Sequence, residues 1–447
     1  MKFTDLNLNN PLLNALNDLG FTQATTIQHK AFPVVMSGRD VVGIAQTGTG
    51  KTLGYLLPIL RQWEFSKKKE TRVLILVPTR ELVVQVVEAA KKLTPYMSVA
   101  IEGVYGGGNI KVQMAALSHG ADIVVGTPGR VIDLIMNASL KIKTVKKLVI
   151  DEVDEMLGLG FRHQLTTILN LLPPKRQNLM FSATLTEEVE DLIKTYFYGP
   201  IKIEAAPVGT PLDNIEQHAY EVPNFNTKVN LLQLLLNQSE MKKVLVFAAT
   251  KQLADDLYEK IEPLFPEEIG VIHSNKSQNN RFETVKRFGT GQYRALIATD
   301  IIARGLDIAE VSHVINFDVP EEAENYIHRI GRTGRADAKG NAITFITERE
   351  AETVEAIEKL MNTQVPRLDL PEELEISDVL TKDEMPQLDT MNVQDKYKKK
   401  LPKGGGAFHE KLQKNQKVNF HLTRAEKLKL KYGKPKTRGQ KPPRKKK

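Results

Sequence analysis

Short apolar runs recur along the chain and alternate with longer stretches of helical period. The runs are continuously apolar and rich in Val, Ile and Leu, a pattern typical of parallel strands covered by helices on both faces. Helical segments such as 80–93 and 252–262 fall between them, and this order predicts repeated β-α-β units. The apolar runs are 40–45, 73–78, 122–128, 147–152 and 178–184 in the first half, and 243–250, 268–274, 294–300, 313–318 and 342–347 in the second.

The two groups of runs predict an α/β fold with two doubly wound parallel-sheet domains. A Pro- and Gly-rich stretch without apolar periodicity, AAPVGTPLDN, separates them and is interpreted as a linker. A length of 447 residues allows two or three domains with full hydrophobic cores. The predicted parts are an N-terminal region 1–29, a first domain 30–204, the linker 205–214, a second domain 215–370, an acidic linker 371–395 and a basic tail 396–447.

Charge sets the tail apart from the rest of the chain. Residues 396–447 hold 20 Lys and Arg against Glu410 and Glu426, a net +18, which leaves −10 of the total +8 for the first 395 residues. With few apolar residues and this charge, the tail is expected to be mostly disordered. It either solubilises the protein, docks on another protein, or binds a polyanion, for which RNA or a ribonucleoprotein is the leading candidate.

Composition excludes several classes of site. The chain has no cysteine, and so no disulfide, thiolate nucleophile or Cys-ligated metal. No stretch approaches the roughly 20 apolar residues of a membrane span, and the N-terminus lacks the basic and apolar regions of a secretion signal. We expect a cytoplasmic protein, monomeric and without membrane contact.

A glycine-rich segment, AQTGTGKT, follows the first apolar run. Gly48 and Gly50 allow backbone N–H groups to wrap phosphate oxygens at the N-terminus of the next helix. Lys51 is expected to reach the β- and γ-phosphates of a nucleotide, and Thr52 to bind Mg²⁺. Ala45 stands at the first Gly position of the general pattern. The other residues expected to contact nucleotide in this segment are Gln46, Thr47 and Thr49.

An acidic tetrad, DEVD, closes the run KKLVIDEVDEM about 100 residues after the glycine-rich segment. Asp151 at a strand end can hold Mg²⁺, and Glu152 can orient and deprotonate the attacking water. Alone, such a tetrad is more often solvated surface. In this order after a phosphate-binding loop it predicts a nucleotide hydrolase.

Further motifs narrow the class. They are GFTQATTIQ (20–28), PTREL (78–82), GG (106–107), TPGR (127–130), SAT (182–184), QNNR (278–281), ATD (298–300), ARGLD (303–307) and HRIGRTGR (328–335). In content and order they resemble the DEAD-box ATP-dependent RNA helicases of superfamily 2, from Phe3 to about Ile346. The overall layout is most similar to the bacterial RhlE-like subgroup. The resemblance implies RecA-like domains, ATP and Mg²⁺ as nucleotide and metal, and RNA as partner, with local, non-processive strand opening.

The resemblance also implies roles for individual residues. Gln28 would read adenine and Phe21 would cover the base, while Asp307 would lie on the ribose. Arg332 and Arg335 would act as arginine fingers on the transferring phosphoryl group. Coupling would pass through Ser182, Thr184, His328 and Arg329, the last two linking their segment to 151–154 and the nucleotide. The implied RNA-backbone contacts are Thr79, Arg80, Gly106, Gly107, Thr127, Pro128, Gly129 and Arg130 in the first domain, and Arg281 and Thr299 in the second.

Three positions depart from the family pattern: Ala24 replaces the usual Pro, Val153 the usual Ala, and VFAATK (246–251) is a loose form of the fourth motif. Two other classes share part of the pattern. A DNA helicase or translocase would not need Gln28 or the TPGR and ARGLD motifs, and RNA against DNA stimulation of the ATPase separates the two. A non-enzymatic, ATP-gated RNA clamp or scaffold would not need Glu152, Arg332 and Arg335.

Overall fold

A computed structural model describes residues 2–45, 48–68, 70–204, 214–300, 311–334, 339–381 and 384. Within them, the chain forms two seven-stranded sheets, in which every strand pair is parallel. The first contains β1 (Val41–Ile44), β2 (Val73–Leu76), β3 (Ile101–Val104), β4 (Ile123–Gly126), β5 (Lys147–Asp151), β6 (Gln177–Ser182) and β7 (Ile201–Glu204). The second contains β8 (Ile215–Glu221), β9 (Val244–Phe247), β10 (Ile269–Ile272), β11 (Ala295–Ala298), β12 (His313–Asn316), β13 (Gly340–Ile346) and β14 (Arg367–Leu368).

Helices connect the strands, as parallel pairing requires. In the first domain they are η1 (Phe3–Leu6), α1 (Asn10–Asp18), α2 (Thr26–Met36), α3 (Lys51–Arg61), α4 (Arg80–Leu93), α5 (Ile110–Ser118), α6 (Pro128–Met136), α7 (Val153–Gly158), α8 (Arg162–Leu171) and α9 (Glu187–Tyr196). In the second they are α10 (Phe225–Leu236), α11 (Lys251–Ile261), η2 (Glu262–Leu264), α12 (Gln278–Gly289), α14 (Ala323–Ile330), η3 (Glu348–Glu350) and α15 (Ala351–Met361).

The two sheets share one strand order. The first runs β3-β4-β2-β5-β6-β1-β7 and the second β10-β11-β9-β12-β13-β8-β14. Counted from the first strand of each sheet, both read 3-4-2-5-6-1-7. The two domains are therefore repeats of one architecture, and the predicted pair of doubly wound parallel-sheet domains is confirmed.

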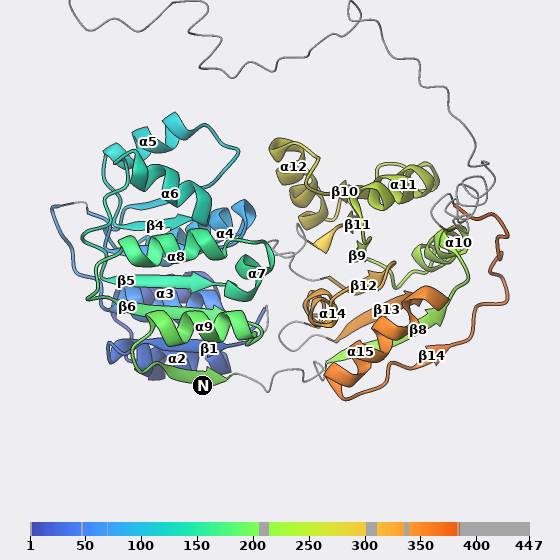
Figure 1. Ribbon diagram of the computed structural model, residues 1–447, viewed down its shortest axis with the longest axis horizontal. Helices are drawn as coiled ribbons and strands as arrows, with labels where there is room; N and C mark the ends of the chain where they lie inside the picture. Colours follow the sequence, from blue (N-terminus) through green and yellow to red (C-terminus); the bar gives the residue numbers. More distant parts are fainter. Residues whose placement is uncertain are drawn as a thin grey trace, which may run out of the picture. The chain divides into compact units, whose positions relative to one another are not determined.

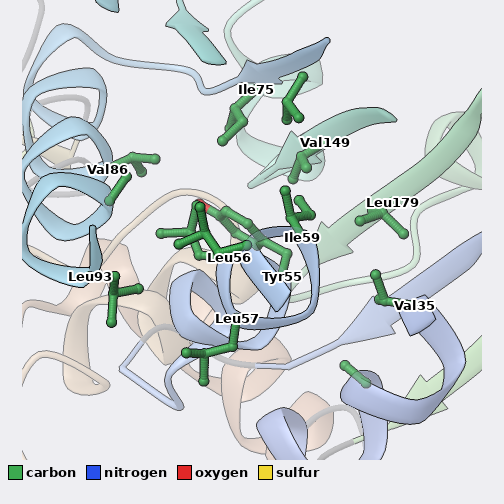
Figure 2. Packing of buried hydrophobic residues seen from close by; sticks show 14 of the residues in the cluster. Val35, Tyr55, Leu56, Leu57, Ile59, Ile75, Val86, Leu93, Val149 and Leu179 are labelled. Carbon is green, nitrogen blue, oxygen red and sulfur yellow. The ribbon is translucent and has the colours of Figure 1, made fainter. Parts of the chain in front are cut away.

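The core of the first domain has two layers, one on each face of its sheet (Figure 1). Successive strand residues enter opposite layers: Val73 and Ile75 pack with α2, α3 and α4, whereas Leu74 and Leu76 pack with α6, α8 and α9. Figure 2 shows the first layer, where Tyr55, Leu56 and Ile59 of α3 lie among strand and helix side chains. Burial on both faces explains why these strands are continuously apolar. The second domain is built likewise, with α10 and α11 in one layer and α12, α14 and α15 in two clusters opposite.

All ten predicted strands are present, each within a few residues of its expected bounds. The four unforeseen strands are β3, β7, β8 and β14, of which β3, β7 and β14 lie at sheet edges. Edge strands are covered less completely, and the burial of β3 and β7 is interrupted by partly exposed or exposed positions. The continuous apolar signal that marks central strands is therefore absent from them.

A segment after β14 belongs to the second domain by its contacts. Asn224 Nδ2 donates to Ser377 O (2.5 Å), Ser377 N donates to Thr227 Oγ1 (3.0 Å), and Glu384 Oε1 accepts from Phe225 N (2.6 Å). We call residues 371–381 together with Glu384 the strap. It forms the first part of the predicted acidic linker.

Several predicted features lie outside the described residues. They are Gln46, Thr47, Asp307, Arg335, nearly all of the predicted linker and the whole basic tail. Among the helices that the structure does describe, none combines the length and apolarity of a membrane span.

Candidate ATP and RNA sites at the carboxyl edge of the first sheet

Strand order divides the carboxyl edge of the first sheet into two halves. The glycine-rich segment, the acidic tetrad and the SAT motif follow β1, β5 and β6, which are neighbours in the order β5-β6-β1. The GG, TPGR and PTREL motifs follow β3, β4 and β2, also neighbours. Because every pair is parallel, all six motifs leave the sheet at one edge, where ligands of open α/β sheets bind. The fold thus gathers the predicted nucleotide residues at one half of this edge and the predicted RNA residues at the other.

The glycine-rich segment follows β1 and ends at the first turn of α3. Gly48 (φ 82°) and Gly50 (φ 88°) have left-handed backbone conformations that glycine adopts without strain. Lys51 is the first residue of α3 and is buried, but its Nζ has no hydrogen-bond partner among the described residues. A buried, unpaired ammonium at a helix N-terminus is suited to phosphate oxygens.

Asp151 and Glu152 stand at the end of β5, and both are buried. Asp151 Oδ1 and Glu152 Oε2 have no hydrogen-bond partner within the described part of the chain. Burial raises the pKa of Asp151, and it raises the pKa of Glu152 to about 7, although the charge of Lys51 opposes the shift in both groups. Buried oxygens without partners at a strand end fit a bound cation and a reacting water, and the Thr52 hydroxyl lies one residue beyond Lys51.

Glu152 also has an unusual backbone. Its φ of 54° and ψ of 51° lie in the left-handed region, which costs a residue other than glycine of order 1–3 kcal/mol. The chain leaves β5 and enters α7 at this residue. Its side chain is therefore held beside Asp151 at a conformational cost.

Tyr55 is a residue of this site that sequence analysis did not find. It lies on α3 three residues after Thr52, which places it on the same helix face, and it is fully buried. Burial and the negative charge of Asp151 raise the pKa of its hydroxyl well above the usual value, so this group stays protonated. The hydroxyl has no hydrogen-bond partner of ordinary geometry among the described residues. Only the helical spacing from Thr52 could have pointed to it.

Of the two residues expected to bind adenine, one is exposed and the other is buried. Phe21 is exposed and free to cover a base. The Gln28 amide is buried and has two internal partners: Oε1 accepts from Thr25 N (2.9 Å), and Nε2 donates to Gly50 O (3.1 Å). Gln28 thereby caps α2 and contacts the glycine-rich segment directly at Gly50. To read adenine it would have to exchange these partners.

The SAT motif is bound to the last residue of the acidic tetrad. Asp154 Oδ2 accepts from Ala183 N (3.0 Å), Thr184 N (2.9 Å) and Thr184 Oγ1 (3.0 Å), and Ser182 Oγ donates to Thr184 O (2.7 Å). Burial alone would raise the pKa of Asp154, but the charges of His328 and Lys51 and the Thr184 hydrogen bonds outweigh it and lower the pKa. The expected coupling segment is thus hydrogen-bonded to the acidic tetrad that follows β5.

The HRIGRTGR motif supplies contacts to this end of β5. His328 Nδ1 lies 2.7 Å from Glu155 Oε1, so it meets the residue after the tetrad. Arg332 is buried, and its charge lowers the pKa of Glu152, against the larger effect of burial. The expected phosphoryl-stabilising Arg332 therefore lies within electrostatic range of the expected base.

Arg329 has partners that sequence analysis did not foresee. It was expected to link its segment to 151–154 and the nucleotide. In the structure it contacts second-domain groups: two bonds reach the Asp300 carboxylate (2.6 and 2.8 Å), and others reach Asn316 Oδ1 (3.3 Å) and Asp318 O (2.6 Å). Its guanidinium also covers the Phe247 ring at 4.9 Å. A guanidinium with so many fixed partners holds the ends of β11 and β12 together.

The expected RNA residues of the first domain meet at the ends of β3, β4 and β2. Gly107 (φ 77°) lies so close to the Arg80 guanidinium that a Cβ on Gly107 would stand 2.0 Å from Arg80 Nη1. Arg130 is turned inward, with Nη2 donating to Gly108 O (3.1 Å). The remaining residues lie at helix starts: Thr79 caps α4, and Thr127, Pro128 and Gly129 begin α6.

Two further expected RNA residues lie in the second domain. Arg281 of α12 is buried and forms an ion pair with Glu81, and Arg80 Nη1 donates to Gln278 Oε1 (2.9 Å). Thr299 directly follows β11 and is buried. The motifs after β10 and β11 thus occupy, in the second sheet, the same half of the strand order as the RNA motifs of the first.

Comparison with known proteins decides the family. The profile described as DEAD/DEAH box helicase matches residues 25–192, and that of the helicase conserved C-terminal domain matches 227–337. The RNA helicase CrhR of Synechocystis is 40% identical over 369 residues, 83% of this chain and 74% of that relative. The DEAD-box ATP-dependent RNA helicase CshA of Bacillus cereus is 38% identical over 83% of this chain and 70% of its own. The chain belongs to the DEAD-box RNA helicases.

Solved structures of DEAD-box helicases have the same fold. Dbp5 of S. cerevisiae bound to RNA and ADP BeF₃ is 29% identical with a TM-score of 0.75, over 82% of this chain and 95% of that one. The DEAD-box helicase Mss116 bound to single-stranded RNA is 28% identical with a TM-score of 0.77, over 83% of this chain and 81% of that one. The two sheets are therefore the tandem RecA-like domains of a DEAD-box helicase, an ATP-dependent RNA helicase and RNA-dependent ATPase.

Proposed function

We propose that this DEAD-box helicase hydrolyses ATP between the ends of β1 and β5 and uses the cycle to open short RNA duplexes or remodel ribonucleoproteins. The observation that carries the proposal is a set of buried groups that have no hydrogen-bond partner among the described residues: Lys51 Nζ, Asp151 Oδ1 and Glu152 Oε2. Leaving such groups unpaired costs folding free energy unless a ligand supplies the partners. A nucleoside triphosphate, its metal ion and a water molecule would supply partners for all three groups.

Each residue then has a defined task. Lys51 binds the terminal phosphates, and Glu152 takes a proton from the water that attacks the γ-phosphorus, giving ADP and phosphate. A base with a pKa of about 7 is well matched to neutral conditions. Arg332, and Arg335 beyond the described residues, stabilise the negative charge on the transferring group.

The proposed metal is Mg²⁺, held by Thr52 and Asp151. When bound, it neutralises negative charge on the phosphate oxygens. Both side chains offer oxygen atoms, the donors that Mg²⁺ prefers.

RNA is proposed to bind along the β3-β4-β2 half of the first sheet, with Arg281 and Thr299 adding contacts from the second domain. Backbone N–H groups, hydroxyls and arginines suit phosphate and 2′-OH groups, and they give little sequence preference. Coupling to the ATP site is proposed to run through the bonds that join Thr184 to Asp154 and His328 to Glu155. We also propose that the protein acts as a cytoplasmic monomer.

The hydrolytic assignment is tested with Glu152→Gln, which keeps the shape of the side chain and removes the base. ATP and RNA should still bind, steady-state ATPase should be lost, and the complex with both should persist. Glu187→Gln, an exposed position on α9, is the matched control. Near-normal ATPase in Glu152→Gln would refute the assignment.

The basic tail is proposed to anchor RNA through its net charge of +18. A chain ending at Asp395 should keep its ATPase rate at saturating RNA but bind RNA more weakly. The full chain should show the steeper salt dependence, at ~0.7 counterions released per phosphate contact on single strands. Titrating labelled RNA with both chains across a salt series decides the matter. Equal affinities and equal slopes would leave protein docking or solubilisation as the tail's role.

A further inference from the structure

One side chain outside every motif shapes the loop that carries Gly106 and Gly107. Gln113 lies on α5, and its amide forms two hydrogen bonds with the backbone of one residue: Nε2 donates to Tyr105 O (3.1 Å), and Oε1 accepts from Tyr105 N (3.3 Å). Tyr105 directly follows β3, which lies at the edge of the sheet. The amide thus takes the place of a neighbouring strand and continues the pairing for one residue.

The same amide oxygen also holds Arg130. Arg130 Nη1 donates to Gln113 Oε1 (2.9 Å), while Nη2 donates to Gly108 O (3.1 Å). The Arg130 side chain is only 9% exposed, so these bonds are shielded from water. Gln113 and Arg130 therefore fix the loop on both sides, at Tyr105 and at Gly108.

The segment held between these two points is Gly106–Gly107, which has no side chains of its own. Gly107 is exposed, so the loop can contact a phosphate only through backbone N–H groups. The direction of an N–H group is set entirely by the backbone conformation of the loop. A loop that is already fixed loses less conformational entropy when it binds.

We propose that Gln113 is a positioning residue for RNA: it orients the Gly106–Gly107 backbone, directly and through Arg130, without touching the RNA. The inference rests on the proposed RNA role of this loop. By this inference, Gln113 strengthens RNA binding although it lies on a helix outside all of the sequence motifs.

The test uses the full chain, Gln113→Ala and a fluorescein-labelled oligouridine. The change removes three hydrogen bonds, some of which water can replace, so RNA affinity should fall about tenfold. The RNA concentration for half-maximal ATPase should rise by the same factor, while kcat at saturating RNA and ATP affinity stay unchanged. Gln164→Ala, on α8 of the same domain, is the control and should match the parent chain.

A second variant separates this inference from the proposed function. Gly107→Ala places a Cβ against the Arg80 guanidinium at a positive φ, and it should weaken RNA binding if the loop contacts RNA. Weaker binding in Gly107→Ala with normal binding in Gln113→Ala would overturn the positioning role alone. Normal binding in both would overturn the RNA role of the loop. A lower melting temperature or lost ATP affinity in Gln113→Ala would show a general structural role and also overturn the proposal.

Discussion

The two sheets share one strand order but treat the equivalent helix start in opposite ways. In the first domain, Lys51 at the start of α3 is buried, and its ammonium has no hydrogen-bond partner among the described residues. In the second, α10 follows the corresponding strand, and the Nζ of buried Lys228 lies 3.2 Å from Asp318 Oδ1 and 3.0 Å from Glu350 Oε2. The helix N-terminus itself is occupied by Glu384 of the strap, which accepts from Phe225 N.

If Lys51 binds nucleotide as proposed, one architecture serves as a ligand site in the first domain and is closed by the protein's own side chains at the equivalent place in the second. A carboxylate at a helix N-terminus makes the contacts that a phosphate would make. The second domain closes its helix start with its own acidic side chains, whereas the ammonium of Lys51 in the first has no hydrogen-bond partner among the described residues and is proposed to bind phosphate. Topology provides the position, and the local charge balance decides whether it is a site.

The sharpest test of this division concerns the arginine finger proposed for the second domain. Arg335→Ala should cut RNA-stimulated ATPase ~10³-fold or more in the full chain, because an arginine finger stabilises the transferring group. A fragment holding the first domain alone lacks Arg335 and should still bind nucleotide, which equilibrium titration with a fluorescent ATP analogue would show. A loss below tenfold in the full chain would contradict the proposed division of labour.

The two lysines should respond in opposite ways to the same change. Lys51→Ala should lower ATPase by roughly 10²–10³-fold by removing charge stabilisation at the phosphates, with no loss of stability in nucleotide-free protein. Lys228→Ala leaves Asp318 and Glu350 facing each other, and breaking a buried ion pair costs roughly 3–5 kcal/mol. Urea unfolding and ATP titration of both variants provide the comparison. If Lys51→Ala were the destabilised variant, the contrast between the domains would fail.

The smallest expected effect concerns the strap. Glu384→Gln weakens the bonds from Phe225 N and from Thr381 N and Oγ1 (2.6, 2.8 and 2.8 Å), and a lost helix cap costs about 1 kcal/mol. Although burial opposes the shift, these hydrogen bonds lower the pKa of Glu384. The stability that the Glu384 carboxylate adds to the folded state should therefore be fully present at pH values above the ordinary pKa of Glu. It should be lost as the pH falls through the lowered pKa of Glu384.

Denaturant unfolding of the parent chain and Glu384→Gln at several pH values measures that contribution. The free energies of unfolding of the two proteins should become equal at acid pH. Equal stability at neutral pH would show that the strap lies on the domain without holding it. Glu372→Gln, at an exposed position earlier in the strap, serves as the control.

A feature could be predicted from the sequence when it leaves a local pattern of residues, and not when it depends on contacts formed only in the folded chain. Strands that are buried along their whole length were predictable because burial on both faces leaves a continuous apolar run, and Lys51, Asp151 and Glu152 lie at or soon after the end of such a run. The strands β3, β7, β8 and β14 were missed because partial exposure breaks that run. Glu384 and Gln113 were missed because their partners lie 159 and 8 residues away and depend on the folded path. No local pattern distinguishes such residues from solvated polar positions.

The left-handed backbone of Glu152 has a consequence for any attempt to redesign this enzyme. Sequence optimisation aimed at thermal stability favours glycine or asparagine at such a φ. Here that choice would relax the turn out of β5 and delete the side chain on which turnover is proposed to depend. Libraries of stabilising variants should therefore keep Glu152 unchanged. They should look for gains at exposed helix positions, where relieving backbone strain does not remove a functional side chain.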